Sequence, residues 1–246
     1  MQLSYFVIHL KRAEAREPNV QVLKSILPGT VSVIDAVDGT LIGDDQINQV
    51  YVPGLHKPKY PFSLRNTEIA CFLSHRKAWK AIAEGSECAG FVIEDDAAVD
   101  SIIFNNAFSL IQLHVDENAF IRFPIKEREK AIKMLGSSES IHHFVPKIVG
   151  LGMVGLLIGK KTALRLLAAT EQFDRPVDTF IQLYWESGVR PTTVYPSGMS
   201  EISNLMGGSV IGTGRKKSFW KTLYREIRRT VYRVQIFMLS ILKSLT

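Results

Sequence analysis

Segments with strand and helix patterns alternate along the first two hundred residues, and this alternation constrains the fold more than any other feature. Runs rich in apolar and β-branched residues occur at positions 4–10, 30–34 and 89–93. Between them apolar residues recur at three-and-four spacing, most clearly from Asn66 to Gly85. This order predicts an α/β fold with a central, mostly parallel sheet flanked by helices. Ligands of such sheets bind beyond the carboxyl ends of the strands.

The same patterns continue toward the C-terminus. We expect strands over residues 119–123, 144–149, 154–158 and 192–195, and helices over residues 161–169 and 177–187. Residues 40–65 contain Pro53, Pro58 and Pro61, and they are too long for a simple connector. We therefore expect a functional surface loop there.

The charge of the chain is concentrated at its C-terminal end. The net charge is +6, but residues 215–246 hold nine Lys and Arg residues against Glu226 alone. The remainder is slightly acidic, which argues against a body that binds polyanions, so no nucleic-acid partner is expected. We accordingly expect a body over residues 1–214 and a basic helical tail over residues 215–246.

The tail carries one continuous apolar stripe at helical spacing. Its members are Trp220, Tyr224, Ile227, Val231, Val234, Met238, Ile241 and Leu245. An amphipathic helix lying on an anionic membrane surface fits this pattern, with its cations near lipid phosphates. A coiled-coil dimer seam, or a helix packed on the body, would use the same stripe. The apolar stretch is shorter than a membrane span requires.

Three consecutive carboxylates, Glu94-Asp95-Asp96, follow the strand at residues 89–93. Alternate residues of an extended segment point the same way, so Glu94 and Asp96 can share one ligand. A hard divalent cation, Mg²⁺ or Mn²⁺, would relieve the repulsion between them. The alternative is a solvated acidic turn or a helix cap.

The expected helix that begins near Asn66 places Glu68, Cys71, His75 and Trp79 on neighbouring turns. Its polar members can line a cleft, whereas Trp79 is expected in the core. We interpret His75 as a hydrogen-bonded packing residue rather than a metal ligand. A Cys/His nucleophile and base on one helix would have poor attack geometry.

Together these segments resemble glycosyltransferase family 25, the lipopolysaccharide and lipooligosaccharide sugar transferases. The resemblance spans about residues 3–204 and rests on Leu10-Lys11-Arg12 with Arg16, Glu68 to Trp79, Glu94-Asp95-Asp96, Pro176-Val177-Asp178 and Ser200-Glu201-Ile202. The chain departs from the family pattern at His9, where Asn is usual, and at Ala70, where Gly is usual. The strand near residues 152–158 also lacks the usual Tyr. These departures bear on donor choice more than on fold.

The resemblance implies a GT-A-like nucleotide-diphosphosugar transferase fold with UDP-galactose as a frequent donor. It implies Mn²⁺ or Mg²⁺ held by Glu94 and Asp96, and a saccharide acceptor on a lipid-linked core. With the pattern of the tail, which the family's lipid-linked acceptors support, we expect a cytoplasmic enzyme associated peripherally with the inner face of the membrane. The expected donor-binding residues are Leu10, Lys11, Arg12, Arg16, Glu68, His75 and Asp95.

The chemistry of sugar transfer agrees with these residue types. Breaking a sugar-phosphate bond requires neutralisation of the departing diphosphate, which a carboxylate-held cation supplies. Arg12 or Arg16 can pair with a phosphate or edge the uridine pocket. A carboxylate base would deprotonate the acceptor hydroxyl in an inverting displacement. We expect Asp178 in this role, with Glu201 and Asp174 as rivals.

Other interpretations of these residues remain. Asp178 opens an expected helix, so it can instead stabilise the helix start. His142 and His143 are adjacent on a strand and point to opposite faces, which indicates structural or surface roles. The same acidic triplet would serve a nucleotidyltransferase, a phosphohydrolase, or a membrane-tethered binding module for nucleotide sugar or glycan. The two cysteines, Cys71 and Cys88, are too few for a disulfide framework and favour a reducing compartment.

Overall fold

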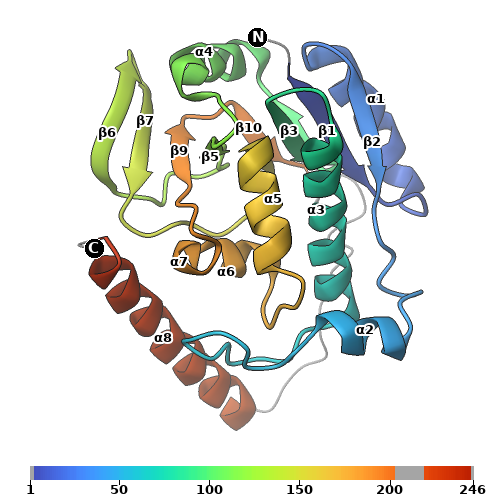
Figure 1. Ribbon diagram of the computed structural model, residues 1–246, viewed down its shortest axis with the longest axis vertical. Helices are drawn as coiled ribbons and strands as arrows, with labels where there is room; N and C mark the ends of the chain where they lie inside the picture. Colours follow the sequence, from blue (N-terminus) through green and yellow to red (C-terminus); the bar gives the residue numbers. More distant parts are fainter. Residues whose placement is uncertain (1–2, 203–218, 245–246) are drawn as a thin grey trace.

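One eight-stranded sheet with helices on both faces organises the computed structural model, which describes residues 3–202 and 219–244 (Figure 1). The strand order is β2-β1-β3-β8-β5-β9-β7-β6. Strands β7 and β8 are antiparallel to the other six strands. The predicted mixed α/β class with a large, mostly parallel sheet is therefore confirmed.

The N-terminal half of the sheet follows the predicted order closely. Its elements are β1 (Ser4–His9), the 3-10 helix η1 (Glu14–Arg16), α1 (Glu17–Ile26), β2 (Val31–Asp35), α2 (Asp44–Val50), α3 (Asn66–Glu84) and β3 (Ala89–Glu94). Strands β1, β2 and β3 are parallel neighbours. The expectation of a loop over residues 40–65 was wrong in one respect, because this segment contains the short helix α2.

The remaining elements complete the sheet and its helical layers. They are β4 (Ala97–Val99), α4 (Ser101–Ile111), the 3-10 helix η2 (Gln112–His114), β5 (Phe120–Arg122), β6 (Ala131–Ser138), β7 (Ile141–Pro146), β8 (Gly155–Gly159), α5 (Lys160–Ala169), α6 (Val177–Ile181), α7 (Tyr184–Ser187), β9 (Thr192–Tyr195), β10 (Met199–Glu201) and α8 (Phe219–Leu242). Strands β4 and β10 form a separate antiparallel pair. The expected single helix at residues 177–187 is two helices, because the backbone of the buried Leu183 leaves the helical region.

The core has two apolar layers, one on each face of the sheet. Helices α3, α5 and α6 cover one face, and α1 and α4 cover the other (Figure 1). Alternation along β1 sends Phe6 and Ile8 into the first layer and Tyr5 and Val7 into the second. Trp79 has no exposed surface, as predicted. The central strands are buried on both faces, which leaves their ends as the place for polar function.

Helix α8 packs on the body through a face that the sequence analysis did not identify. Tyr232 and Ile236 are buried against Leu183, with Tyr60 and Trp185 at the edge of the contact. The expectation that packing on the body would use the predicted apolar stripe was wrong. Among the stripe members whose side chains the structure describes, Ile241 is half-buried, and the others are 46% to 63% exposed: Tyr224, Ile227, Val231, Val234 and Met238.

Three features of the expected tail fall outside what the structure describes. The Trp220 side chain, Leu245 and the expected boundary between residues 214 and 215 all lie beyond the described parts. No helix within the described ranges is both long enough and apolar enough to cross a membrane.

Candidate functional site

Sheet topology brings the residues that follow β1, Leu10 to Arg16, next to the acidic triplet at the carboxyl ends of the strands. β1 pairs with β3 in parallel, with Ile8 opposite Glu94, so the residues that follow these strands meet. The β4–β10 pair then sets Glu201 opposite Ala97, and the Ile202 amide donates to the Asp96 carbonyl at 2.9 Å. Glu201 thereby reaches the triplet from more than a hundred residues away.

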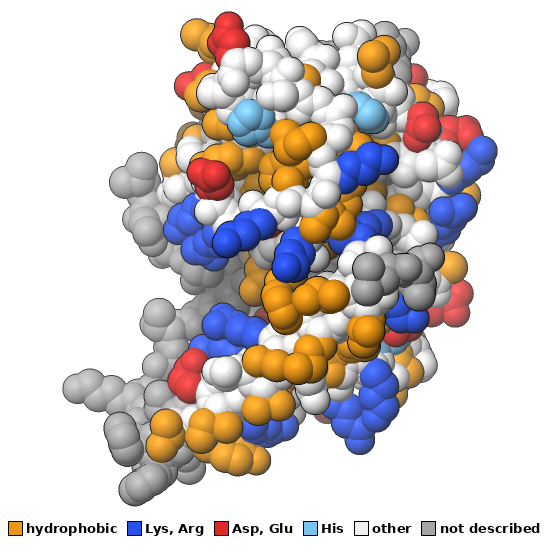
Figure 2. Space-filling model, turned by 90° about the vertical axis from the view of Figure 1, so that its left-hand side faces the viewer, with side chains coloured by type: hydrophobic (Ala, Val, Ile, Leu, Met, Phe, Trp, Pro, Cys, Tyr) orange, Lys and Arg blue, Asp and Glu red, His pale blue; other side chains and the backbone are white. Residues whose placement is uncertain are grey.

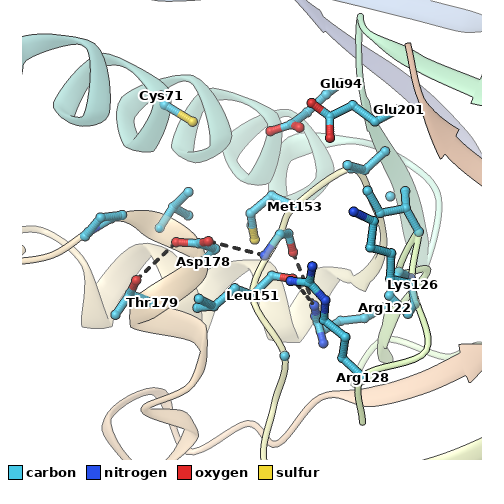
Figure 3. A pocket seen from close by; sticks show the side chains of 18 of the residues that line it. Cys71, Glu94, Arg122, Lys126, Arg128, Leu151, Met153, Asp178, Thr179 and Glu201 are labelled. Atoms are coloured by element: carbon cyan, nitrogen blue, oxygen red, sulfur yellow. Dashed lines mark hydrogen bonds between the residues drawn. The ribbon is translucent and has the colours of Figure 1, made fainter. Parts of the chain in front are cut away.

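Two adjoining pockets open at these strand ends. A small one of about 160 Å³, called here the triplet pocket, is lined by Leu10, Arg12, Arg16, His75 and the triplet, together with apolar Ala36 and Val37. A larger one of about 580 Å³, called here the large pocket, is lined by Glu68, Lys126, Arg128, Asp178 and Glu201 among others (Figure 3). Cys71 and Glu94 line both pockets. The two cavities therefore meet at these side chains.

Within the triplet, Asp95 is held from two sides. Arg16 Nη1 donates to Asp95 Oδ1 at 2.6 Å, and His9 Nδ1 lies 2.8 Å from Asp95 Oδ2. His9 thus fills the position where the family usually has Asn with a direct contact to the triplet. Asp95, expected to bind donor, is buried and has both oxygens engaged by protein groups.

Asp96 carries the unbalanced charge of the triplet. Its Oδ2 lies 3.1 Å from Arg16 Nη2, yet burial first, and then the charge of Glu94, raises the pKa of Asp96 to about 6. Glu201 adds to the same effect. Arg16 therefore offsets the local negative charge only in part, and a cation at Glu94 and Asp96 would relieve the rest.

A second set of potential ligand atoms lies at the junction of the two pockets. Ligand atoms of Cys71, His75 and Glu94 lie within 4.8 Å of one another. His75 Nε2 is 3.3 Å from Glu94 Oε1, and His75 Nδ1 is buried without a hydrogen-bond partner. Burial, reinforced by nearby carboxylates, raises the pKa of the Cys71 thiol well above its usual range. A protonated thiol is a weak ligand, so the carboxylates fit a hard cation better than this set fits a soft one.

Asp178 faces the large pocket across from Glu94 and Glu201, whose carboxylates point toward one another at the other end (Figure 3). It accepts hydrogen bonds from the Gly152 amide and the Thr179 hydroxyl, both at 3.2 Å. Burial raises the pKa of Asp178 above its usual value. The N-cap residue of α6 is Pro176, so Asp178 is not the N-cap; it lies in the first turn of α6, where a carboxylate favours the helix start, and it also lines the large pocket.

Its rival Asp174 is differently placed. Arg175 binds both oxygens of Asp174, with Nε at 2.6 Å from Oδ1 and Nη2 at 3.0 Å from Oδ2. Both side chains are fully buried. Asp174 is thus neutralised within the protein and is not disposed to take a proton from a substrate.

The remaining expected donor-binding residues divide between the pockets and the surface. Arg12 lines the triplet pocket and forms an ion pair with Asp38, whereas Lys11 forms an exposed ion pair with Asp35. Glu68 lines the large pocket, and its Oε2 also accepts the backbone N–H of Arg65 at 2.9 Å, as the capping box of α3.

Sequence reasoning missed two cations at the large pocket. Lys126 and Arg128 follow β5, are exposed and line the cavity, and neither has an ion-pair partner among the described residues. Arg122, by contrast, is buried in an ion pair with Glu129. The alternating charges of residues 126–130 look like any solvated turn, so only the fold separates the pocket cations from the paired ones.

The sequence of this chain is similar to one family model and to several known proteins. The family model described as glycosyltransferase family 25 (LPS biosynthesis protein) matches residues 2–181. A glycosyltransferase 25 family member of Drosophila pseudoobscura pseudoobscura is 28% identical over 189 residues, covering 74% of this chain and 30% of the relative. Human procollagen galactosyltransferase 2 is 27% identical over 195 residues, covering 73% and 30%.

A human relative named inactive glycosyltransferase 25 family member 3 is 33% identical over 101 residues, which is 39% of this chain and 17% of that protein. The chain spans about a third of the length of the first two relatives. The family model covers β1, α3 and β3, and with them the triplet and the helix that lines both pockets.

Proposed function

Because this chain belongs to glycosyltransferase family 25, we propose that it is a metal-dependent hexosyltransferase with a GT-A-like fold. It moves galactose, or alternatively glucose, from a UDP-sugar to a saccharide hydroxyl of a lipopolysaccharide or lipooligosaccharide core. The observation that carries the proposal is the junction of the two pockets at Cys71 and Glu94. One cavity can hold a nucleotide and the other a sugar and its acceptor, with acidic residues between them. The names of the procollagen galactosyltransferases favour galactose.

The triplet pocket suits the donor nucleotide. Ala36 and Val37 offer an apolar wall for a base, and Arg12 offers a cation for its polar edge or phosphate. Glu94 and Asp96 would hold Mn²⁺ or Mg²⁺ beside the diphosphate. When bound, such an ion neutralises charge that develops on the leaving diphosphate.

Asp178 is proposed as the general base. Its raised pKa brings the carboxylate closer to the pH of the cell, which suits proton transfer. The acceptor O–H proton passes to the Asp178 carboxylate while the acceptor oxygen bonds the anomeric carbon. The bond from that carbon to the diphosphate oxygen breaks, and its electron pair leaves with the diphosphate. Glu201, at the other end of the pocket, is the second candidate.

We also propose that α8 attaches the enzyme to an anionic membrane surface on the cytoplasmic side. Figure 2 turns the left-hand side of Figure 1 toward the viewer and shows hydrophobic side chains gathered with Lys and Arg on that face. Val231 and Met238 are 52% and 58% exposed, and Arg228 and Arg233 are exposed on the same helix. Apolar side chains flanked by cations suit anionic lipid better than a second apolar helix.

The test of activity is turnover with a panel of UDP-hexoses and saccharide acceptors, with and without Mn²⁺. Asp96→Asn should abolish metal-dependent donor binding. Asp178→Asn should spare that binding and lower transfer by about 10²-fold to 10⁴-fold. Asp45→Asn, an exposed residue of α2, is the matched control and should behave as wild type. Normal transfer by either site variant removes that residue from the mechanism.

A second candidate function is a binding module for nucleotide sugar or glycan, which the name of the inactive human relative makes worth testing. Such a module would bind UDP-sugar with metal and release no UDP. A nucleotidyltransferase or phosphohydrolase would instead release pyrophosphate or inorganic phosphate. Mass analysis of the products separates the three functions.

Membrane attachment has its own test. The double variant Val231→Ser, Met238→Ser should lose binding to vesicles that contain phosphatidylglycerol and keep binding donor. Val22→Ser, at an equally exposed position of α1, should keep vesicle binding. Unchanged vesicle binding by the α8 variant contradicts the attachment proposal.

A further inference from the structure

A third cavity lies between α8 and the loop at residues 51–63. It measures about 380 Å³ and is called here the α8 cavity. Its lining combines aromatic rings, hydroxyl groups and two arginines, contributed mainly by Tyr51, Tyr60, Phe62, Ser63, Arg225 and Arg228. Its size is in the range of small-molecule sites. The sequence analysis assigned no role to this combination.

The α8 cavity has an excess of positive charge. Glu226 is the only acidic residue of α8, and Arg229 binds it at 2.6 Å. No ion-pair partner for Arg225 or Arg228 occurs among residues 3–202 and 219–244. Asp174 also lines the cavity, but Arg175 neutralises it. The cavity therefore attracts an anion.

Aromatic packing fixes the position of one arginine in the α8 cavity. The Arg225 guanidinium lies 5.0 Å from the centre of the Phe62 ring, and the Arg225 Nε is buried without a hydrogen-bond partner. Tyr51 accepts the Leu64 N–H at 3.1 Å, which leaves its own proton to donate elsewhere. An ordered guanidinium beside hydroxyl donors is a common arrangement for binding phosphate oxygens.

Tyr60 connects the α8 cavity to the candidate active site. Its side chain lines both the α8 cavity and the large pocket. Its ring packs edge-on against Tyr232 of α8 at 5.5 Å and against Phe62 at 5.7 Å. Arg225 lies on α8, the helix that also carries the exposed apolar stripe. One side chain thus separates the proposed acceptor pocket from a cationic cavity on the membrane-binding helix.

We infer that the α8 cavity binds a phosphate group carried by the lipid-linked acceptor and so orients its saccharide toward the large pocket. This inference rests on the proposed function. Phosphate on the acceptor saccharide and phosphate in a lipid headgroup share the chemistry that Arg225 and Arg228 recognise. The position of the cavity next to the large pocket favours the saccharide as the source.

The test uses the full chain and three arginine variants with equal change of charge. Arg225→Gln and Arg228→Gln remove a cation of the cavity, whereas Arg233→Gln removes an exposed cation of α8 outside it. One arm measures binding of glucose 1-phosphate by calorimetry. The other measures binding to phosphatidylcholine vesicles that contain phosphatidic acid. Circular dichroism verifies that each variant is folded.

Each cavity variant should weaken glucose 1-phosphate binding by about tenfold, because it loses a charge-assisted hydrogen bond. Arg233→Gln should change that affinity less than twofold, by the same reasoning. Equal loss of glucose 1-phosphate affinity in all three variants would mean a general charge effect and would overturn the inference. Selective loss with vesicles but not with glucose 1-phosphate would mean a lipid headgroup site, which also overturns it.

Donor binding distinguishes this inference from the proposed function. Metal-dependent binding of UDP-sugar should be the same in wild type and all three arginine variants, because Arg225, Arg228 and Arg233 lie outside the triplet pocket. Absence of donor binding in the wild type contradicts the proposed function itself. Normal donor binding without selective loss of glucose 1-phosphate contradicts the phosphate site alone.

Discussion

The bond between Tyr232 and Arg175 joins α8 to the segment that leads into Asp178, and its removal is a sharp test of the docked helix. Arg175 Nη1 donates to the Tyr232 hydroxyl at 2.8 Å, and both residues are buried. The other bonds of Arg175 use Nε and Nη2, with the Asp174 carboxylate and the carbonyls of His56 and Pro58 as acceptors. Tyr232→Phe therefore leaves Nη1 unpaired while it keeps the aromatic ring.

The expected cost follows from this geometry. A hydrogen bond to a charged group contributes about 1.5 to 3 kcal/mol, and the ring contacts with Tyr60 remain. Since about 1.4 kcal/mol corresponds to a factor of ten, the undocked population of α8 should rise about 10-fold to 150-fold. Transfer should fall with it, because Arg175 is three residues before the proposed base.

Amide hydrogen exchange measures this change directly. Protection of the α8 amides should fall by the same factor in Tyr232→Phe, while protection in β1 and β3 stays constant. Tyr224→Phe makes the same chemical change at a 63% exposed position of the same helix and should leave protection unaltered. Equal protection of α8 in both variants, or a uniform loss across the sheet, would refute a docked helix held by this bond.

Two further predictions concern the body. Burial, and then the charge of His114, lowers the pKa of His143 from 6.5 to about 4. The unfolded chain therefore binds this proton more readily than the folded protein does. The free energy of unfolding is highest above about pH 6.5 and decreases as the pH falls toward 4. Urea unfolding should show a loss of up to about 3 kcal/mol across that range, absent in His143→Gln and retained in the exposed His142→Gln. A Cβ at Gly159 would lie 2.4 Å from backbone atoms of the chain at residues 116–117, so Gly159→Ala should cost at least about 1 to 3 kcal/mol. Gly43 is an N-cap like Gly159 but has nothing within 4 Å, so Gly43→Ala should lose only the preference for Gly at an N-cap, about 1 kcal/mol or less; similar losses at both positions contradict the packing argument.

Local patterns were sufficient to predict most of the sheet and much of the residue set at its edge. β1, β3 and α3 have strong periodicity and clear ends, so their positions follow from short windows of sequence. Helix α2 was missed because its seven residues are largely polar and lie among prolines and glycines. The division between α6 and α7 depends on burial of Leu183, which is a tertiary contact.

The site shows the same division between local and long-range information. The triplet was visible as a motif, and its junction with Cys71 lay within one expected helix and the next strand. Lys126 and Arg128 carried no local signal, because nothing in residues 126–130 distinguishes a pocket cation from a surface cation. The α8 cavity depends on a loop and a helix more than 150 residues apart, so sequence spacing alone contains no trace of it.

Helix geometry indicates that α8 can bind the body and a membrane at once. At about 100° per residue, Tyr232, Ile236 and Ser240 lie on one side, and Ile227, Val231, Val234 and Met238 lie on the opposite side. The first set is buried and the second is exposed. Vesicle binding should therefore leave the α8 amides protected, and Tyr232→Phe should keep its affinity for anionic vesicles while its transfer activity falls. If vesicle binding instead removed the protection of α8, one helix face would have to serve both contacts in turn, and the cavity beside Tyr60 would open whenever the enzyme reached its acceptor.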